Sequence, residues 1–176
     1  MSMQPIHPND NHDGEHVLYA GTTGAGKSVA TQKMKRIKAT DQVVIWDFYG
    51  QYHDKKFLGR EVRTYDSLKT FFKAVYAGRK TNQGFKIAFT PKSAPDGKRA
   101  KRELFLKYCQ VVWSLGDGDH KKKLHCIMEE INRVTITTGD EDSIYGELLE
   151  VGRKFGFVIH SVSQRLAPIP NTVISM

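Results

Sequence analysis

A segment near the start of the chain has the residue types and spacing of a phosphate-binding loop. Gly21-Thr22-Thr23-Gly24-Ala25-Gly26-Lys27-Ser28 fits the pattern G-x-x-x-x-G-K-[ST]. Glycines let the backbone curl so that its N–H groups point at phosphate oxygens, and a helix that follows adds its positive end. Lys27 would reach the β- and γ-phosphates of ATP, Ser28 would bind Mg²⁺, and Val29 would border the same site. We therefore expect residues 21–29 to bind a nucleotide.

Hydrolysis of ATP needs three further groups: an acid that holds Mg²⁺, a base that orients water, and a sensor of the γ-phosphate. Two apolar runs end in acid, one at Asp47 and one at Glu129-Glu130. Only the second offers adjacent carboxylates, so we expect Glu129 to hold Mg²⁺ through water and Glu130 to activate the attacking water. Asp47 is the alternative metal acid. The last apolar run leads into Gln164, whose amide can bind the γ-phosphate or the water.

These side chains need a scaffold, and the hydrophobic pattern alternates between strand and helix. We expect strands at 16–20, 43–46, 85–89, 124–128 and 157–162, and helices at 27–38, 66–78, 98–115 and 142–154. This alternation predicts an α/β domain over residues 16–176, with a mostly parallel sheet and helices on both faces. Residues 1–15 are polar and are expected to form a flexible arm. Ligands of such folds bind at the carboxyl ends of the strands, where all the polar motifs lie.

The amino-acid composition of the chain indicates the chemical class of its binding partner. The chain has 27 Lys and Arg against 19 Asp and Glu, a net charge of +8, which favours a polyanionic partner. Two basic clusters, Lys98–Arg102 and Lys121–Lys123, are candidates for neutralising DNA phosphates. Cys109 and Cys126 lack the spacing of a zinc or redox motif and are expected to be reduced, buried thiols. No apolar run has the length of a membrane span and no signal peptide is present, so we expect a cytoplasmic protein.

The chain resembles the HerA–FtsK superfamily of P-loop DNA-pumping ATPases. The resemblance rests on the loop at 21–28, the turn Asp47-Phe48-Tyr49-Gly50-Gln51-Tyr52, the pair Glu129-Glu130 and the segment Ser163-Gln164-Arg165. It implies a RecA-like P-loop NTPase fold of the additional-strand, catalytic-glutamate type. It also implies an ATPase that requires Mg²⁺ and moves double-stranded DNA. The chain departs from the family at Glu129, where Asp is usual, and at Gln51, where Glu is usual.

The same resemblance implies a homo-oligomeric ring, often a hexamer, with ATP at the subunit interfaces. One subunit of such a ring donates an arginine to the nucleotide of its neighbour, and this arginine stabilises the charge of the transition state. Arg153, in the segment Arg153-Lys154-Phe155-Gly156, matches that position best, and Arg165 is the alternative.

Within the superfamily the chain is most similar to the genome-packaging ATPases of tailless, membrane-containing icosahedral viruses, the tectivirus-like group. This similarity implies a viral genome-packaging motor in the host-cell cytoplasm or on the virion, with a capsid vertex or a membrane-associated viral protein as docking partner. Filamentous-phage-assembly and cellular DNA-pumping ATPases share the motor and stay an alternative. The family places another strand beyond the sensor strand. We therefore expect a C-terminal strand to be missing from this sequence, with a sheet edge completed by a neighbouring chain as the alternative.

Two rivals come from other functional classes. A small nucleotide or metabolite kinase uses the same loop, but it also needs an Arg-rich lid and an acceptor pocket, which the sequence does not identify. A nucleotide-gated DNA-binding or scaffold protein would bind DNA in an ATP-dependent way with almost no turnover. Phosphate release without an acceptor separates the kinase from the ATPase, and turnover separates the ATPase from the scaffold.

Overall fold

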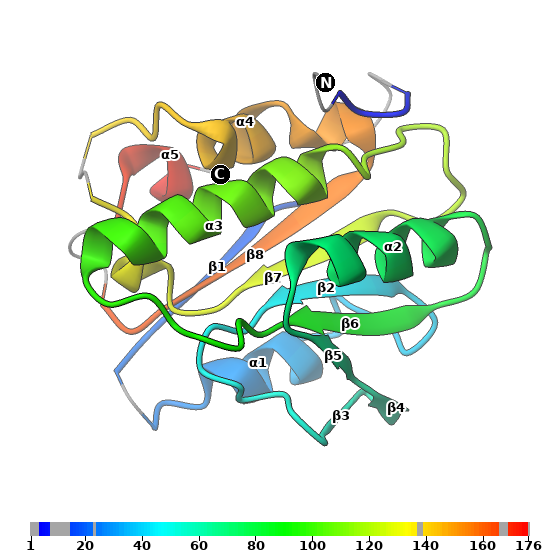
Figure 1. The fold of residues 1–176 in the computed structure, drawn as a ribbon, viewed down its shortest axis with the longest axis horizontal. Helices are drawn as coiled ribbons and strands as arrows, with labels where there is room; N and C mark the ends of the chain where they lie inside the picture. Colours follow the sequence, from blue (N-terminus) through cyan, green and yellow to red (C-terminus); the bar gives the residue numbers. More distant parts are fainter. Residues whose placement is uncertain (1–3, 8–14, 23, 137–138, 166–168, 176) are drawn as a thin grey trace.

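Six strands form one sheet in the computed structural model, in the order β1-β8-β7-β2-β6-β5, and every neighbouring pair is parallel (Figure 1). The structure describes residues 4–7, 15–22, 24–136, 139–165 and 169–175. The strands of the sheet are β1 (Val17–Ala20), β2 (Gln42–Trp46), β5 (Arg63–Tyr65), β6 (Phe85–Phe89), β7 (Leu124–Met128) and β8 (Phe157–Ser163). A separate antiparallel pair consists of β3 (Lys56–Phe57) and β4 (Arg60–Glu61).

Helices cover both faces of the sheet. They are α1 (Lys27–Lys33), α2 (Leu68–Arg79), α3 (Lys98–Trp113), α4 (Ile144–Glu150) and α5 (Asn171–Ile174), with the 3₁₀ helices η1 (Ile131–Arg133) and η2 (Gly152–Phe155). Within the described part of the chain, no helix combines the length and the apolar character needed to cross a bilayer.

The position of β8 defines the class of the fold. β8 lies between β1, which leads into the phosphate-binding loop, and β7, which leads into Glu129 and Glu130. A strand inserted at this place is the additional strand that the resemblance predicts. The expected α/β P-loop fold is therefore confirmed, with a fully parallel main sheet.

Alternate residues of β2 face opposite layers, as strand geometry requires. Val44 and Trp46 lie in the large hydrophobic cluster with α2, α3 and α4, whereas Val43 and Ile45 lie in a smaller cluster with residues from α1 and the β3–β4 pair. Because β2 is buried on both faces, it appears in the sequence as one continuous apolar run.

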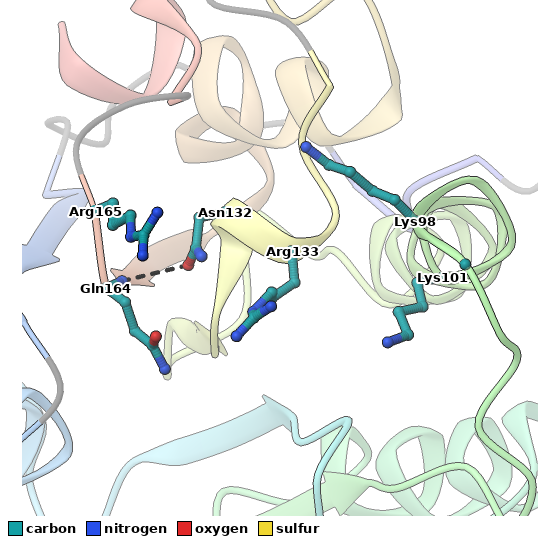
Figure 2. A pocket seen from close by; sticks show the side chains of 7 residues that line it. Lys98, Lys101, Asn132, Arg133, Gln164 and Arg165 are labelled. Carbon is teal, nitrogen blue, oxygen red and sulfur yellow. Dashed lines mark hydrogen bonds between the residues drawn. The ribbon is translucent and has the colours of Figure 1, made fainter.

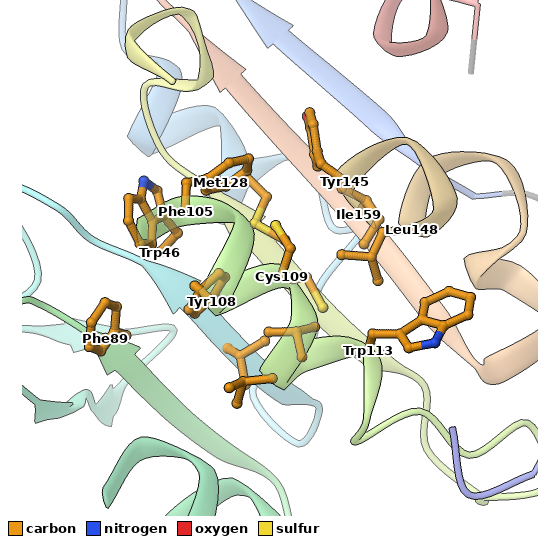
Figure 3. Packing of buried hydrophobic residues seen from close by; sticks show 14 of the residues in the cluster. Trp46, Phe89, Phe105, Tyr108, Cys109, Trp113, Met128, Tyr145, Leu148 and Ile159 are labelled. Atoms are coloured by element: carbon orange, nitrogen blue, oxygen red, sulfur yellow. The ribbon is translucent and has the colours of Figure 1, made fainter. Parts of the chain in front are cut away.

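Aromatic rings fill the large cluster (Figure 3). The ring centroid of Trp46 lies 5.2 Å from that of Phe105 and 5.3 Å from that of Tyr108, both on α3. Cys109 and Cys126 belong to the same cluster and are buried and free, as expected from the sequence. Burial raises the pKa of both thiols, so neither is a reactive thiolate.

The first helix is shorter than the sequence predicts. α1 ends at Lys33 instead of continuing to residue 38, and Lys35 adopts a left-handed conformation with φ of 57°. Leaving the helix at this point carries Ile37 into the core, where it is 2% exposed. Val29 and Met34, at the helix and its C-cap, are exposed to solvent.

Other boundaries also differ. α2 begins at Leu68 with Ser67 as its cap rather than Asp66, since the Ser67 hydroxyl accepts a hydrogen bond from the Thr70 N–H at 3.2 Å. The helix expected over 142–154 is divided into α4 and η2. The strands β3, β4 and β5 were not predicted, because two or three residues are too few to show a strand periodicity.

Part of the N-terminal segment contacts the domain. The N–H of Ile6 donates to the carbonyl of Gly116 at 2.7 Å, and the N–H of Gly118 donates to the carbonyl of His7 at 2.6 Å. These two bonds join Ile6 and His7, from the segment that the sequence predicts to be a flexible arm, to the loop that follows α3.

Candidate nucleotide-binding and hydrolysis site

The phosphate-binding loop connects β1 to α1. Gly24 and Gly26 have φ of 82° and 77°, a conformation that glycine adopts without strain. The Gly21 N–H donates to the carbonyl of Ser163 at 3.2 Å, which fixes the start of the loop against the end of β8. The Lys27 ammonium donates to the carbonyls of Gly21 at 2.7 Å and Thr22 at 2.9 Å. Lys27 is therefore folded over its own loop, at the place where phosphates would bind.

A cavity of about 300 Å³ opens beside this loop. It is lined by Gly24, Gly26, Lys27, Ser28, Val29, Gln51, Glu129, Glu130, Val162, Ser163 and Gln164. The expected metal ligands, the expected general base Glu130 and the expected phosphate sensor Gln164 thus line the same cavity as the loop. Ala25 bonds to the loop through its N–H, which donates to the carbonyl of Thr22 at 3.1 Å. Thr23, also expected to bind nucleotide, lies outside the described residues.

Glu129 is buried in the wall of the cavity, at 4% exposure. One of its oxygens accepts a hydrogen bond of 2.6 Å from the Tyr52 hydroxyl. The pKa of Glu129 is raised to about 7, chiefly by burial; the charges of Asp47 and Glu130 also raise it, whereas the Tyr52 hydrogen bond and Lys27 lower it. The ionised carboxylate is therefore poorly compensated by the chain itself.

This arrangement fits Mg²⁺. Hard oxygen donors suit this ion, which usually takes one or two protein ligands and completes its shell with phosphates and water. Ser28 supplies a hydroxyl and Glu129 a carboxylate at the same cavity. A cation there would also offset the negative charge that burial makes costly on Glu129.

Glu130 lies where β7 turns into η1, in a left-handed conformation with φ of 52°. One carboxylate oxygen accepts a 2.5 Å hydrogen bond from the side-chain amide of Gln164, and the other lies 3.6 Å from Nε of Arg133. The expected water base and the expected sensor are thus in direct contact. A non-glycine residue at this φ is uncommon and stores backbone strain, which is frequent at functional sites.

Asp47, the alternative metal acid, holds a turn together. One oxygen accepts the Gln51 N–H at 2.7 Å, and the other accepts the Tyr52 N–H at 2.9 Å and the Thr90 hydroxyl at 3.3 Å. Asp47 is 1% exposed and does not line the cavity. Its carboxylate therefore positions Gln51 and Tyr52 rather than facing a nucleotide.

The two candidate arginines lie at opposite ends of β8. Arg153 is in η2, just before the strand begins, whereas Arg165 follows its end and lies next to Gln164. A strand from Phe157 to Ser163 spans about 20 Å. Arg153 is consequently remote from the cavity of its own subunit.

A second, basic cavity of about 420 Å³ shares Gln164 with the first (Figure 2). We call it the basic cavity, and its lining is Gly97, Lys98, Lys101, Asn132, Arg133, Gln164 and Arg165. Asn132 was not predicted from the sequence, although its side-chain oxygen accepts from the Gln164 N–H at 3.3 Å and from the Ser163 hydroxyl at 3.3 Å. No local signal marks it, because these contacts join segments about thirty residues apart.

Comparison with known proteins shows similarity in structure only. No family model matches the chain, and no curated protein matches it in sequence. The genome packaging NTPase B204 of Sulfolobus turreted icosahedral virus 2, in complex with AMPPCP, superposes with a TM-score of 0.60 at 14% identity, over 92% of this chain and 71% of that one. Its complex with ATPγS gives a TM-score of 0.56 at 12% identity, over 92% and 70%. The chain therefore has the α/β fold of the P-loop NTPases and shares it with a viral genome-packaging NTPase.

Proposed function

We propose that the chain binds and hydrolyses Mg²⁺-ATP in the 300 Å³ cavity and uses the energy to move double-stranded DNA, as the packaging motor of a viral genome. One observation carries the ATPase: the loop residues Lys27 and Ser28, the carboxylates Glu129 and Glu130, and Gln164 all line that cavity. The shared fold with a packaging NTPase that was captured with ATP analogues supports the same reading.

Each side chain has a role in this reaction. Lys27 leaves the carbonyls of Gly21 and Thr22 and binds the β- and γ-phosphates, while loop N–H groups bind their remaining oxygens. Ser28 and Glu129 hold Mg²⁺, which when bound neutralises charge that develops between the β- and γ-phosphates. Glu129 therefore needs to be ionised, and the cation favours that form.

Glu130 is the general base. It accepts a proton from water as the water oxygen bonds to the γ-phosphorus and the bond from that phosphorus to the ADP oxygen breaks. Gln164 donates to Glu130 and lies within the same cavity, so it can hold the base before the nucleotide enters and bond the γ-phosphate or the water afterwards. Its position at the end of β8 connects the state of the nucleotide to the segment that follows.

The oligomer belongs to the same proposal. Arg153 is too far from its own cavity to act there, so we assign it to the nucleotide of a neighbouring subunit in a homo-oligomeric ring, with a hexamer as the expected form. Arg165 is the alternative for the arginine that reaches the nucleotide of a neighbouring subunit. The net charge of +8 suits a ring that surrounds DNA, and a capsid vertex or membrane-associated viral protein would anchor it in the host cytoplasm or on the virion.

The experiment is phosphate release from Mg²⁺-ATP with and without long double-stranded DNA, combined with displacement of a third strand from a DNA triplex. The proposal predicts turnover that DNA stimulates and triplex displacement that requires hydrolysis. Phosphate release that DNA does not alter would contradict the motor, and transfer of phosphate to an added nucleoside monophosphate would favour a kinase.

Mixing of subunits tests the role of Arg153. Arg153→Ala and Lys27→Ala chains should each be inactive alone, and their mixture should regain part of the turnover, because a mixed interface can combine an intact loop with an intact arginine. Lys154→Ala is the control for loss of a neighbouring charge and should behave as wild type. A mixture with no more turnover than either variant alone would show that Arg153 does not act at the nucleotide of a neighbouring subunit.

A further inference from the structure

The basic cavity brings four cations together from three segments of the chain. Lys98 and Lys101 come from the first turns of α3, Arg133 from η1, and Arg165 from the end of β8 (Figure 2). Lys101 also lies 5.2 Å from the ring centroid of Phe48, in the turn that follows β2, so packing restricts where its ammonium can lie.

Most of this charge has no internal counter-ion. Among the described residues, no carboxylate forms an ion pair with Lys98, Lys101 or Arg165, and only Glu130 approaches Arg133, at 3.6 Å. The first turn of α3 contains no acidic residue, and Gly97 at its N-cap offers no side chain to its N–H groups. An anion in the cavity would therefore meet several cations and a helix N-terminus at once.

The other basic cluster differs. Lys123 is paired with Glu15 at 3.1 Å, and the carbonyl of Lys122 accepts a hydrogen bond from Arg79 at 2.9 Å. Residues 121–123 precede β7, so they lie at the opposite end of that strand from Glu130. Of the two clusters, only the one on α3 lines a cavity that reaches the hydrolysis site.

Both partners of the Glu130 carboxylate line the basic cavity. Gln164 holds one oxygen and Arg133 lies against the other, so neither oxygen is fully available to a water molecule. The arginine side of this ion pair is open to solvent, with 56% of the Arg133 side chain accessible against 15% of Glu130, and at 3.6 Å the pair is weak. A phosphate bound in the cavity would compete for the Arg133 guanidinium, because phosphate is a bidentate acceptor that matches its geometry.

We propose that the basic cavity binds a backbone phosphate of double-stranded DNA, and that this phosphate draws Arg133 away from Glu130 and frees the base to activate water. The inference rests on the proposed function, since it concerns how DNA reaches the same hydrolysis site. In this arrangement, DNA is not only what the motor moves: its binding also increases the rate of ATP hydrolysis. Phosphates are alike along any sequence, so the signal is independent of base sequence.

Two variants test the two halves of the inference. Arg133→Ala removes the residue that holds Glu130, so turnover without DNA should rise by about two- to fivefold, the range expected for an exposed ion pair, while the further stimulation by DNA should shrink. Lys98→Ala removes one phosphate contact, so more DNA should be needed for half-maximal stimulation, and the slope of log affinity against log salt should fall by about 1.

Lys107→Ala is the matched control. It removes the same charge from the same helix, α3, but Lys107 belongs to neither basic cluster and does not line the basic cavity. This variant should leave basal and DNA-stimulated turnover unchanged. Binding of labelled DNA is followed by fluorescence anisotropy without nucleotide, so that the effect on DNA affinity is measured apart from turnover.

The outcomes separate this inference from the proposed function. DNA-stimulated turnover that Arg133→Ala and Lys98→Ala alter no more than Lys107→Ala does would overturn the inference and leave the motor in place. A wild-type chain that binds DNA but hydrolyses no ATP would overturn the motor and the release of Glu130 together. Equal stimulation by sodium sulfate at the same ionic strength would show that the cavity responds to any small anion, which would overturn its assignment to DNA.

Discussion

Two polar networks in this chain each begin at a buried tyrosine and include buried titratable groups, but they end in different surroundings. The carboxylate network, at the carboxyl ends of the strands, consists of Tyr52, Glu129, Glu130, Gln164 and Arg133. The histidine chain, on the face of the sheet that α1 covers, consists of Tyr19, His160, His125 and Asp41. The first network opens into two cavities, whereas the second is mostly buried, lines neither cavity and ends at the partly exposed Asp41.

In the histidine chain each group is a hydrogen-bond partner of the next. The Tyr19 hydroxyl lies 3.2 Å from Nδ1 of His160, Nε2 of His160 lies 3.0 Å from Nδ1 of His125, and Nε2 of His125 lies 3.5 Å from Asp41. With each Nε2 carrying a proton, every ring nitrogen has a partner. Burial lowers the pKa of His125 to about 4 and that of His160 to about 3, so both rings are neutral and serve the core.

Burial has the opposite consequence in the carboxylate network. It raises the pKa of Glu129 to about 7 and leaves its charge without a full internal partner. The comparison shows that burial of titratable groups does not by itself mark a functional site. A network that ends in a cavity and lacks a counter-charge is built for a ligand, whereas a network that closes on itself stabilises the fold.

The largest expected effect comes from breaking the histidine chain. His160→Phe keeps a ring of similar size but leaves Tyr19 and His125 without a buried partner, and each such loss costs about 1–3 kcal/mol. We expect the free energy of unfolding to fall by roughly 4 kcal/mol, measured by urea denaturation at pH 7.5. Nucleotide affinity, measured where the variant is folded, should stay unchanged, and a large loss of affinity would contradict the separation of the two networks.

The wild-type protein should lose stability in acid because of the same chain. The pKa values of His125 and His160 are near 6.5 in the unfolded state and about 4 and 3 in the folded state, so between pH 6.5 and 4 the unfolded state binds more protons. Stability therefore falls as pH decreases through that window; His16, whose pKa burial lowers to about 4, adds to this fall, and Glu129 opposes it. Denaturation curves at intervals of pH measure this, and a flat profile would contradict it.

A smaller effect of opposite sign is expected at Glu129. Its pKa is 4.5 in the unfolded state and about 7 in the folded state, so the folded state binds more protons in that window and stability falls as pH rises. Glu129→Gln should therefore raise the free energy of unfolding at pH 8 by about 2 kcal/mol without nucleotide, and the gain should vanish below pH 4.5. Saturating Mg²⁺-ATP should reverse the order, because only the wild type gains the metal contact.

Much of the fold follows from local patterns. A few consecutive residues are enough to predict the Gly-rich loop between an apolar run and a helix. The same is true of the apolar runs that form β2, β6, β7 and β8. The first helix was predicted too long because Ile37 fits a helical spacing, although it reaches the core only after the chain leaves the helix at Met34. Tertiary packing determines where α1 ends, so this boundary cannot be predicted from the local sequence.

The site was less accessible to sequence reasoning. Asp47 has the residue type of a metal acid, but its own turn uses both oxygens, which only the folded backbone reveals. The partner of Glu129 is Tyr52, which is 77 residues away, and the partner of Glu130 is Gln164, 34 residues away. The basic cavity likewise combines α3, η1 and the end of β8, so its charge density exists only after folding.

In the proposed reaction, Glu130 is the base that activates water for the hydrolysis of ATP. The most direct measurement is phosphate release from Mg²⁺-ATP by wild type and Glu130→Gln, with ATP binding measured in parallel by fluorescence of a labelled analogue. We predict that turnover falls by about 10²-fold or more in Glu130→Gln while binding is kept, because general base catalysis contributes about that much. Turnover equal to that of the wild type would show that Glu130 takes no part in hydrolysis and would contradict the account.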